Sequence, residues 1–248
     1  MVATLVGGTL LASCSQRSAI TPGSIRVAVA SNFAATLADL CRAFEAQSPY
    51  HVILVLGSTG KHYAQIHNGA PLDIFFAADA RRPALLEREG LAVAGSRFTY
   101  AIGKLVLWSP QEGYVAADGE PLLPRACRHL AIANPQLAPY GRAAQEVLRA
   151  RGLWETLRGQ LVQGENIGQA FQFVESGNAE AGFVAYSQVK RPQQPIRGSL
   201  WLVPEELYSP IEQQVVLLQE SAAAHAFLDF VRSAAAREIL HGYGYSTP

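Results

Sequence analysis

Short apolar runs alternate along this chain with stretches whose apolar positions recur every three or four residues. The first apolar run, at residues 27–30, predicts a buried strand. Ser31 and Asn32 follow it, and the next apolar positions keep helical spacing: Leu37, Leu40, Cys41 and Phe44. A strand that turns directly into a helix at Ser-Asn directs free backbone N–H groups and a hydroxyl at one place, which suits an anion. The alternative is that Ser31 or Asn32 is only a helix N-cap.

The same pattern returns at residues 51–61. An apolar run predicts a second strand at 51–56, and the small residues of "GSTGK" at 57–61 lead into another helix. A nucleotide-binding P-loop has four residues between its glycine and the Gly-Lys pair, followed by Ser or Thr. Here only Ser58 and Thr59 intervene, and His62 follows. We therefore interpret this stretch as a second junction of small hydroxyl residues, whose glycines let the backbone approach a ligand.

Two more junctions of this kind are predicted in the second half of the chain. Pro139 and Tyr140 stand at the start of a helix, where the missing N–H of proline matters least. Asn166 is a good N-cap, and Ile167 would lie in the first helical turn with its amide free. Four strand ends, two in each half, thus present small residues and helix N-termini with few charged side chains.

The remaining elements complete an alternation of strands and helices. Strands are predicted at 73–77, at 98–110 as one or two strands, at 130–133, near 161, at 181–189 and at 213–218, and further helices at 82–89 and 222–240. Asp73 and Asp79 are interpreted as strand-end and capping residues rather than as an acid–base pair. Such alternation predicts parallel α/β sheets, in which ligands bind at the carboxyl ends of strands.

Composition narrows the functional classes. The chain has 248 residues, which allows two domains of about 100 residues each. It carries 20 Lys and Arg residues against 20 Asp and Glu residues, and this balance argues against a nucleic-acid partner. No Cys or His spacing matches a zinc site, and Cys41 is expected to be buried as a small hydrophobe. We expect no cofactor.

The N-terminal segment predicts export. Residues 1–13 form a short apolar run that ends in small residues before Cys14, which is typical of a lipoprotein signal peptide, although no Lys or Arg precedes the run. Cleavage before Cys14 would leave its thiol for a lipid, and residues 14–24 would be a tether. We expect an extracytoplasmic protein, in the periplasm or at the cell surface, anchored through Cys14. The alternative is an ordinary signal peptide with an incidental cysteine.

Several long motifs, in order, resemble one family. They are "VAVASNF", "GSTGKHYAQIHNGAPLDIFFAAD", "APYGRAAQEVL", "GENIGQAFQFVESGNAEAGFVAYSQV" and "ILHGYGY", and they span residues 25–247. These motifs are similar to those of the molybdate-binding proteins of bacterial ABC importers, which are type II periplasmic binding proteins. The resemblance implies two lobes, each a mainly parallel sheet flanked by helices, joined by two hinge crossings. Lobe 1 would comprise residues 25–105 and 206–248, and lobe 2 residues 106–205.

The resemblance also implies a site in the cleft between the lobes, where neutral donors hold a tetrahedral oxyanion through its oxygens, without direct metal ligands. Mapped onto this chain, the donors would be Ser31, Asn32, Ser58 or Thr59, and the amides of Tyr140 and Ile167. Some members use a tyrosine at the end of the strand that reads "GFVAY" here. By spacing from Ile167, Ala185 falls at that position and Tyr186 follows it. A second tier would be Asn166, Ala185 and Tyr186.

The function implied is that of a binding protein, not an enzyme. A monomer would capture molybdate or tungstate and deliver it to the membrane subunits of an ABC permease. One alternative is a binding protein for another oxyanion or small anionic solute, such as sulfate, phosphate or an organic acid. A second is a serine hydrolase on the same scaffold. Against the hydrolase, "GSTG" is not a G-x-S-x-G nucleophile elbow, and no histidine stands at a readable triad position.

Overall fold

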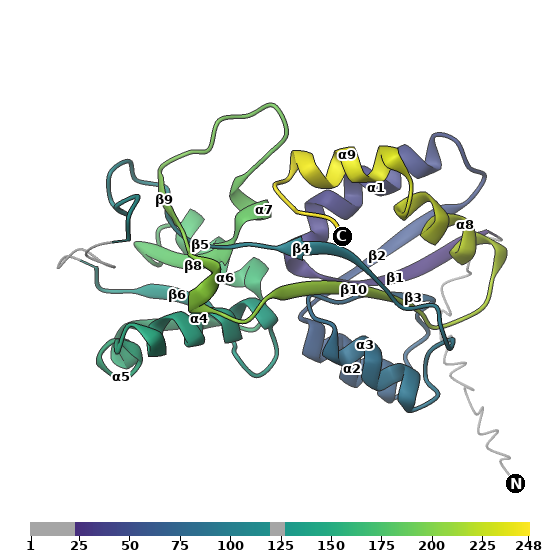
Figure 1. Cartoon of the computed structure of the whole chain (residues 1–248), viewed down its shortest axis with the longest axis horizontal. Helices are drawn as coiled ribbons and strands as arrows, with labels where there is room; N and C mark the ends of the chain where they lie inside the picture. The colour runs from purple at the N-terminus through teal and green to yellow at the C-terminus, as the bar shows by residue number, and fades with distance from the viewer. Residues whose placement is uncertain (1–22, 120–126) are drawn as a thin grey trace, which may run out of the picture.

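The computed structural model describes residues 23–119 and 127–248. They form two lobes that lie side by side (Figure 1). The predicted signal peptide, Cys14 and all but the last two residues of the predicted tether lie outside the described residues. In the part of the chain that the structure describes, no helix combines the length and apolar character that crossing a membrane requires.

Lobe 1 is built on a five-stranded sheet in the order β2-β1-β3-β10-β4. Its strands are β1 (Ser24–Ala30), β2 (His51–Gly57), β3 (Ile74–Phe76), β4 (Phe98–Gly103) and β10 (Ile211–Leu217). Strand β1 runs parallel to β2 and β3, whereas β10 is antiparallel to β3 and β4. The carboxyl ends of β1 and β2 therefore lie side by side at one edge of the sheet.

Helices cover both faces of this sheet, which explains the unbroken apolar run in β1. On one face lie α1 (Ala34–Glu45), α8 (Ala222–Val231) and α9 (Ala234–Gly242), and on the other α2 (Thr59–His67) and α3 (Arg81–Arg88) (Figure 1). Val27 and Val29 are buried with residues of the first group, and Ala28 with residues of the second. Cys41 is buried in α1, as predicted.

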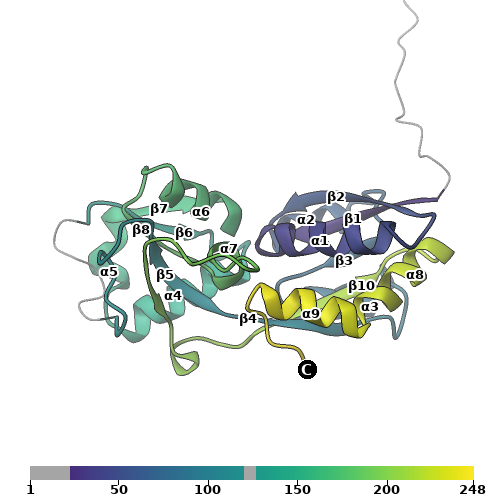
Figure 2. The same ribbon diagram turned by 90° about the horizontal axis from the view of Figure 1, so that it is seen from above.

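Lobe 2 repeats this plan with a sheet in the order β7-β6-β8-β5-β9. The strands are β5 (Leu105–Ser109), β6 (Leu130–Ala133), β7 (Leu161–Gly164), β8 (Ala181–Ala185) and β9 (Ser199–Leu202). Helices α4 (Pro139–Ala150) and α6 (Ile167–Glu175) pack on opposite faces (Figure 2), and α5 (Trp154–Leu157), α7 (Tyr186–Val189) and three short 3₁₀ helices complete the described elements.

The chain crosses between the lobes twice. Lys104 joins β4 to β5, and residues 203–210 join β9 to β10, so both hinge segments lead into strands of the two sheets (Figure 1). The two-lobed α/β fold is as predicted, but each sheet is mixed, because the strands next to the crossings, β5 and β10, run antiparallel to their neighbours.

Four details differ from the sequence prediction or make it more specific. The strand expected at 181–189 ends at Ala185, where α7 begins, and β9 was not predicted at all. The stretch 98–110 forms two strands in different lobes. Asp73 and Asp79 have the local roles expected of them, since Asp73 Oδ2 accepts the Arg26 N–H (2.6 Å) and Asp79 Oδ1 accepts the Arg82 N–H (3.0 Å) at the start of α3.

Candidate anion-binding site

A small cavity of about 10 Å³ lies between the lobes, where strands end and helices begin. Its walls carry no charged side chain; they are Ala30, Ser31, Asn32, Gly57, Ser58, Thr59 and Ala78 of lobe 1, and Ala138, Pro139, Tyr140 and Ile167 of lobe 2. Pockets for drug-sized ligands usually enclose about 300–1,000 Å³, so this one is far too small for such a ligand. All six residues predicted as primary donors line it; that they bind a ligand stays a prediction.

The helix that starts at Ile167 leaves one amide for the cavity. Its next two N–H groups are occupied, because Gly168 donates to Ser31 Oγ (3.0 Å) and Gln169 donates to Asn166 Oδ1 (3.1 Å). The N–H of Ile167, at the first helical position, has no acceptor within the helix. It therefore presents a partially positive donor to the cavity that Ile167 lines.

Helices α2 and α4 begin at the same cavity in a similar way. In α2, the Gly60 N–H donates to Leu137 O (2.8 Å) and the Lys61 N–H to Ser58 Oγ (3.3 Å), while the first helical amide, that of Thr59, has no acceptor within the helix. In α4, Pro139 supplies no N–H, so Tyr140 provides the first free amide. Backbone donors from both lobes thus meet at one cavity.

Three hydroxyl groups add to these amides. Ser31 Oγ accepts the N–H of Gly168, Ser58 Oγ accepts that of Lys61, and Thr59 Oγ1 accepts that of Ala78 (3.0 Å). Because each oxygen already accepts a backbone hydrogen bond, its own hydrogen is free to be donated. Both Ser58 and Thr59 line the cavity, so the choice between them stays open.

The side-chain nitrogen of Asn32 belongs to a buried polar network. Its Nδ2 donates to Gln213 Oε1 (2.7 Å) and to Tyr245 Oη (3.1 Å). Because Nδ2 is engaged, the donor that Asn32 has left for the cavity is its backbone amide, in the 3₁₀ turn Ser31–Phe33.

Gln213 is the centre of this network, and sequence reasoning missed it. Its Oε1 also accepts from Tyr100 Oη (3.1 Å), and its Nε2 donates to Tyr140 Oη (3.4 Å) in lobe 2. Burial raises the pKa of Tyr100 and Tyr140 well above the ordinary value and that of Tyr245 to about 12, so these hydroxyls stay protonated. The available signal was a pair of glutamines in a strand whose next three residues are apolar.

The second-tier residues lie outside the cavity walls. Asn166 caps α6, as its hydrogen bond to Gln169 shows. The Ala185 N–H donates to Gln188 Oε1 (3.0 Å), and the Tyr186 N–H donates to Lys104 O (2.9 Å). The Tyr186 ring packs on Gly244, because a Cβ on that glycine would lie 2.5 Å from the ring. Tyr186 is thus not among the walls of the cavity, and a contact from it to a ligand stays untested.

Charges near the cavity are paired with each other. Lys61 Nζ lies 2.8 Å from Glu165 Oε1 across the cleft, and Arg82 Nη1 lies 2.5 Å from Asp79 Oδ2. Among residues 23–119 and 127–248, no group of three or more His, Cys, Asp or Glu side chains is placed to hold a metal ion. The ring nitrogens of His62 contact Val29 O (3.2 Å) and Gln65 Oε1 (3.0 Å) rather than a serine hydroxyl.

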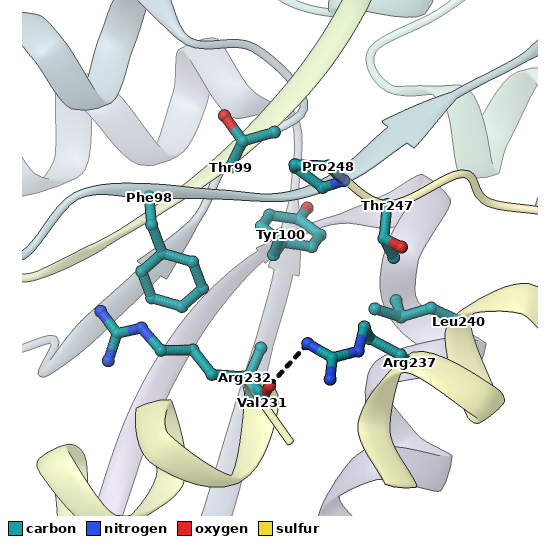
Figure 3. A pocket seen from close by; sticks show the side chains of 9 residues that line it. All are labelled: Phe98, Thr99, Tyr100, Val231, Arg232, Arg237, Leu240, Thr247 and Pro248. Carbon is teal, nitrogen blue, oxygen red and sulfur yellow. Dashed lines mark hydrogen bonds between the residues drawn. The ribbon is translucent and has the colours of Figure 1, made fainter. Parts of the chain in front are cut away.

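A larger cavity of about 200 Å³ opens on lobe 1 alone (Figure 3). Phe98, Tyr100, Leu240 and the two arginines Arg232 and Arg237 are among its walls, and none of the predicted donors is. Arg232 stacks on the Phe98 ring at 3.9 Å from the ring centroid. Because every wall residue belongs to one lobe, closure of the lobes does not enclose a ligand there.

The chain was compared with known families and proteins. The family model described as "Bacterial extracellular solute-binding protein" matches residues 25–246. The molybdate-binding protein ModA of Azotobacter vinelandii is 48% identical over 243 residues, covering 97% of this chain and 94% of that protein. ModA of Rhodobacter capsulatus is 46% identical over 228 residues, covering 91% and 89%.

Solved structures agree with these sequence matches. The periplasmic molybdate-binding protein of A. vinelandii superposes with a TM-score of 0.88 at 42% identity, covering 90% of this chain and 99% of that one. The sulfate-binding protein SubI of Mycobacterium tuberculosis has the same fold, with a TM-score of 0.71 at 16% identity, covering 90% of this chain and 86% of that one. The chain belongs to the bacterial extracellular solute-binding protein family.

Proposed function

We propose that this chain captures molybdate or tungstate outside the cytoplasm and delivers it to an ABC permease. The observation that carries the proposal is an uncharged cavity lined by hydroxyl groups and helix N-termini from both lobes. The identity of 48% and 46% to two molybdate-binding proteins supports this choice of solute. The family and the predicted signal peptide support an extracytoplasmic location.

Neutral donors are sufficient for a dianion. A hydrogen bond to a charged group contributes about 1.5–3 kcal/mol, and the cavity offers three hydroxyls together with the first free amides of several helices. Micromolar affinity corresponds to about 8 kcal/mol. Several such bonds, made together in a cavity with little water, meet that requirement after the costs of association.

A site made only of donors also selects its ligand. A protonated oxyanion such as hydrogen phosphate brings an O–H that finds no acceptor, at a cost of about 1–3 kcal/mol. Sulfate carries the same charge as molybdate, so the size of the cavity has to reject it. Because donors come from both lobes, the bound ion stabilises the closed arrangement, and that closed state is the signal that a permease would recognise.

The proposal also covers the oligomeric state, the cofactor content and the membrane attachment of the protein. We infer a monomer without a cofactor, attached to the membrane through a lipid on Cys14. The small residues before Cys14 support the anchor. Replacing Cys14→Ser should move the processed protein from the membrane fraction to the soluble fraction; an unchanged distribution would contradict the anchor.

Calorimetric titration of the processed protein with molybdate, tungstate, sulfate and phosphate tests the proposed solute. We expect micromolar or tighter binding of molybdate or tungstate, and binding of sulfate and phosphate at least about a hundredfold weaker. Tight binding of sulfate, phosphate or another solute, with no heat from molybdate and tungstate, would overturn it.

A further inference from the structure

Two carbonyl groups of lobe 2 are held by donors of lobe 1 beside the cavity. The Gly60 N–H in α2 donates to Leu137 O at 2.8 Å, and Arg82 Nη2 in α3 donates to Gln136 O at 3.0 Å. None of these four residues is among the walls of the cavity. The two hydrogen bonds therefore join the lobes without requiring contact with the captured ion.

Arg82 is held in the orientation that this contact needs. Asp79 accepts both the Arg82 N–H (3.0 Å) and the Nη1 donor (2.5 Å), and the exposed fractions of the two side chains are only 15% for Arg82 and 6% for Asp79. A guanidinium anchored on one edge in this way presents its other nitrogen in a fixed direction. That direction is toward the Gln136 carbonyl across the cleft.

Gly60 is required for the same approach. A Cβ at this position would lie 2.9 Å from Leu137 O and 3.1 Å from Arg82 Nη2, closer than a methyl group tolerates. Gly60 lies in the first turn of α2, where alanine is a better helix former than glycine. The glycine is therefore unfavourable for the helix itself and is explained by the proximity of lobe 2.

The two carbonyl groups, those of Gln136 and Leu137, belong to a turn that leads into α4. Asn134 organises this turn, because its Oδ1 accepts the Gln136 N–H (2.9 Å) and its O accepts the N–H groups of Leu137 (3.1 Å) and Ala138 (2.9 Å). Helix α4 begins directly afterwards at Pro139, and Tyr140 lines the cavity. Holding the turn therefore places the amide of Tyr140.

We propose that Gly60 and Arg82 form a closure clamp, which grips the turn before α4 and positions the Tyr140 amide against the captured anion. The inference rests on the proposed function, because it assigns these residues a role in retaining that anion. Both act as positioning residues: they slow the release of the ion and do not touch it.

The first test replaces Gly60→Ala and uses molybdate as the probe. In the unliganded protein the melting temperature should stay the same or rise, since alanine favours the helix. The affinity for molybdate should fall at least about tenfold, chiefly through faster dissociation in stopped-flow fluorescence, because closure brings the new methyl group against Leu137 O. Gly159→Ala is the control, since no atom lies within 4 Å of a Cβ there, and it should leave the affinity unchanged.

The second test compares two neighbouring arginines. Arg82→Gln should weaken molybdate binding about tenfold, whereas Arg81→Gln removes the same charge from an exposed position on the same helix and should have no effect. Small-angle scattering with saturating molybdate should show a more open average shape for Gly60→Ala and Arg82→Gln than for the wild type.

The outcomes separate the clamp from the proposed function. If the wild type binds neither molybdate nor tungstate, the proposed function and the clamp both fail. If the wild type binds molybdate, but either Gly60→Ala or Arg82→Gln keeps wild-type affinity and dissociation rate, the clamp alone is overturned. An equal loss in Arg81→Gln would also overturn it, because net charge would then account for the effect.

Discussion

Ser31 Oγ accepts the backbone N–H of Gly168 at 3.0 Å, and this hydrogen bond joins lobe 1 to lobe 2 beside the cavity. Ser31 directly follows β1 at the first strand-to-helix junction, and Gly168 lies in the first turn of α6. The oxygen serves the interlobe contact, while the hydroxyl hydrogen remains for the ion. A single side chain thus couples binding of the ion to closure of the lobes.

Replacing Ser31→Ala should weaken molybdate binding by at least about tenfold. The change removes one donor to the anion and leaves the Gly168 N–H without its acceptor; a hydrogen bond to a charged group contributes about 1.5–3 kcal/mol. Isothermal titration calorimetry measures the loss. Ser233→Ala is the matched control, because Ser233 caps α9 away from the cavity; it should lower the melting temperature but leave affinity intact. Equal affinities for Ser31→Ala and the wild type would remove Ser31 from the site.

Gln213→Leu should reduce both stability and affinity. The leucine side chain has a similar size but removes a hydrogen-bond partner from Tyr140 Oη, from Asn32 Nδ2 and from Tyr100 Oη. Asn32 Nδ2 keeps its bond to Tyr245 Oη, and Tyr100 Oη keeps its bond to Ala77 O. Loss of a partner in a buried place costs about 1–3 kcal/mol, so we expect the free energy of unfolding to fall by about 2–4 kcal/mol in urea titrations. Molybdate affinity should fall as well, because Asn32 and Tyr140 line the cavity.

Gln214→Leu separates the two effects of that change. Gln214 is the next residue of β10, and its side chain contacts Arg97 and Thr99 rather than the cavity walls. This variant should lose stability without losing affinity. A Gln213→Leu protein that is destabilised but binds molybdate like the wild type would show that the network supports the fold alone.

The junctions of the site could be predicted because their signals are local. A small polar residue between an apolar run and a helical stripe marks the places where Ser31, Ser58 and Ile167 lie. Gln213 and Tyr245 carry no such signal: both reach Asn32 from more than 180 positions away in sequence, through topology alone. The orientation of the Asn32 side chain depends on these two partners, so it could not be predicted from the sequence either.

The parallel or antiparallel direction of the strands could not be predicted, for a related reason. A buried strand flanked by helices has the same apolar pattern whether its neighbours run parallel or antiparallel. Strands β5 and β10 are antiparallel to their neighbours, and each of them follows a crossing between the lobes.

Acidification should destabilise the fold through His62. Burial lowers the pKa of His62 below its ordinary value of 6.5. As the pH falls below about 6.5, the unfolded chain takes up the proton before the folded protein does, so the free energy of unfolding decreases until the folded-state pKa is passed. Urea titrations of the wild type and His62→Gln between about pH 8 and pH 5 should therefore show a smaller decrease in the variant. The exposed His225→Gln is the control, and a wild-type slope in His62→Gln would contradict the prediction.

Replacing Asn166→Asp should separate the stability of α6 from the affinity of the site. Aspartate is as good an N-cap as asparagine, and a negative charge at a helix N-terminus contributes about 0.3–1 kcal/mol of stability, so the melting temperature should stay equal or rise. The new carboxylate would stand one residue before Ile167, whose amide faces the cavity, and would repel a dianion by an energy on the order of 1–4 kcal/mol. We expect molybdate affinity to fall at least about tenfold in calorimetry. Two controls accompany this variant. Asn166→Ser keeps a cap without the charge and should retain the affinity for molybdate. Ser221→Asp places the same charge on the distant cap of α8 and should also retain it. If Asn166→Asp binds molybdate as tightly as Asn166→Ser, no dianion is held at the start of α6.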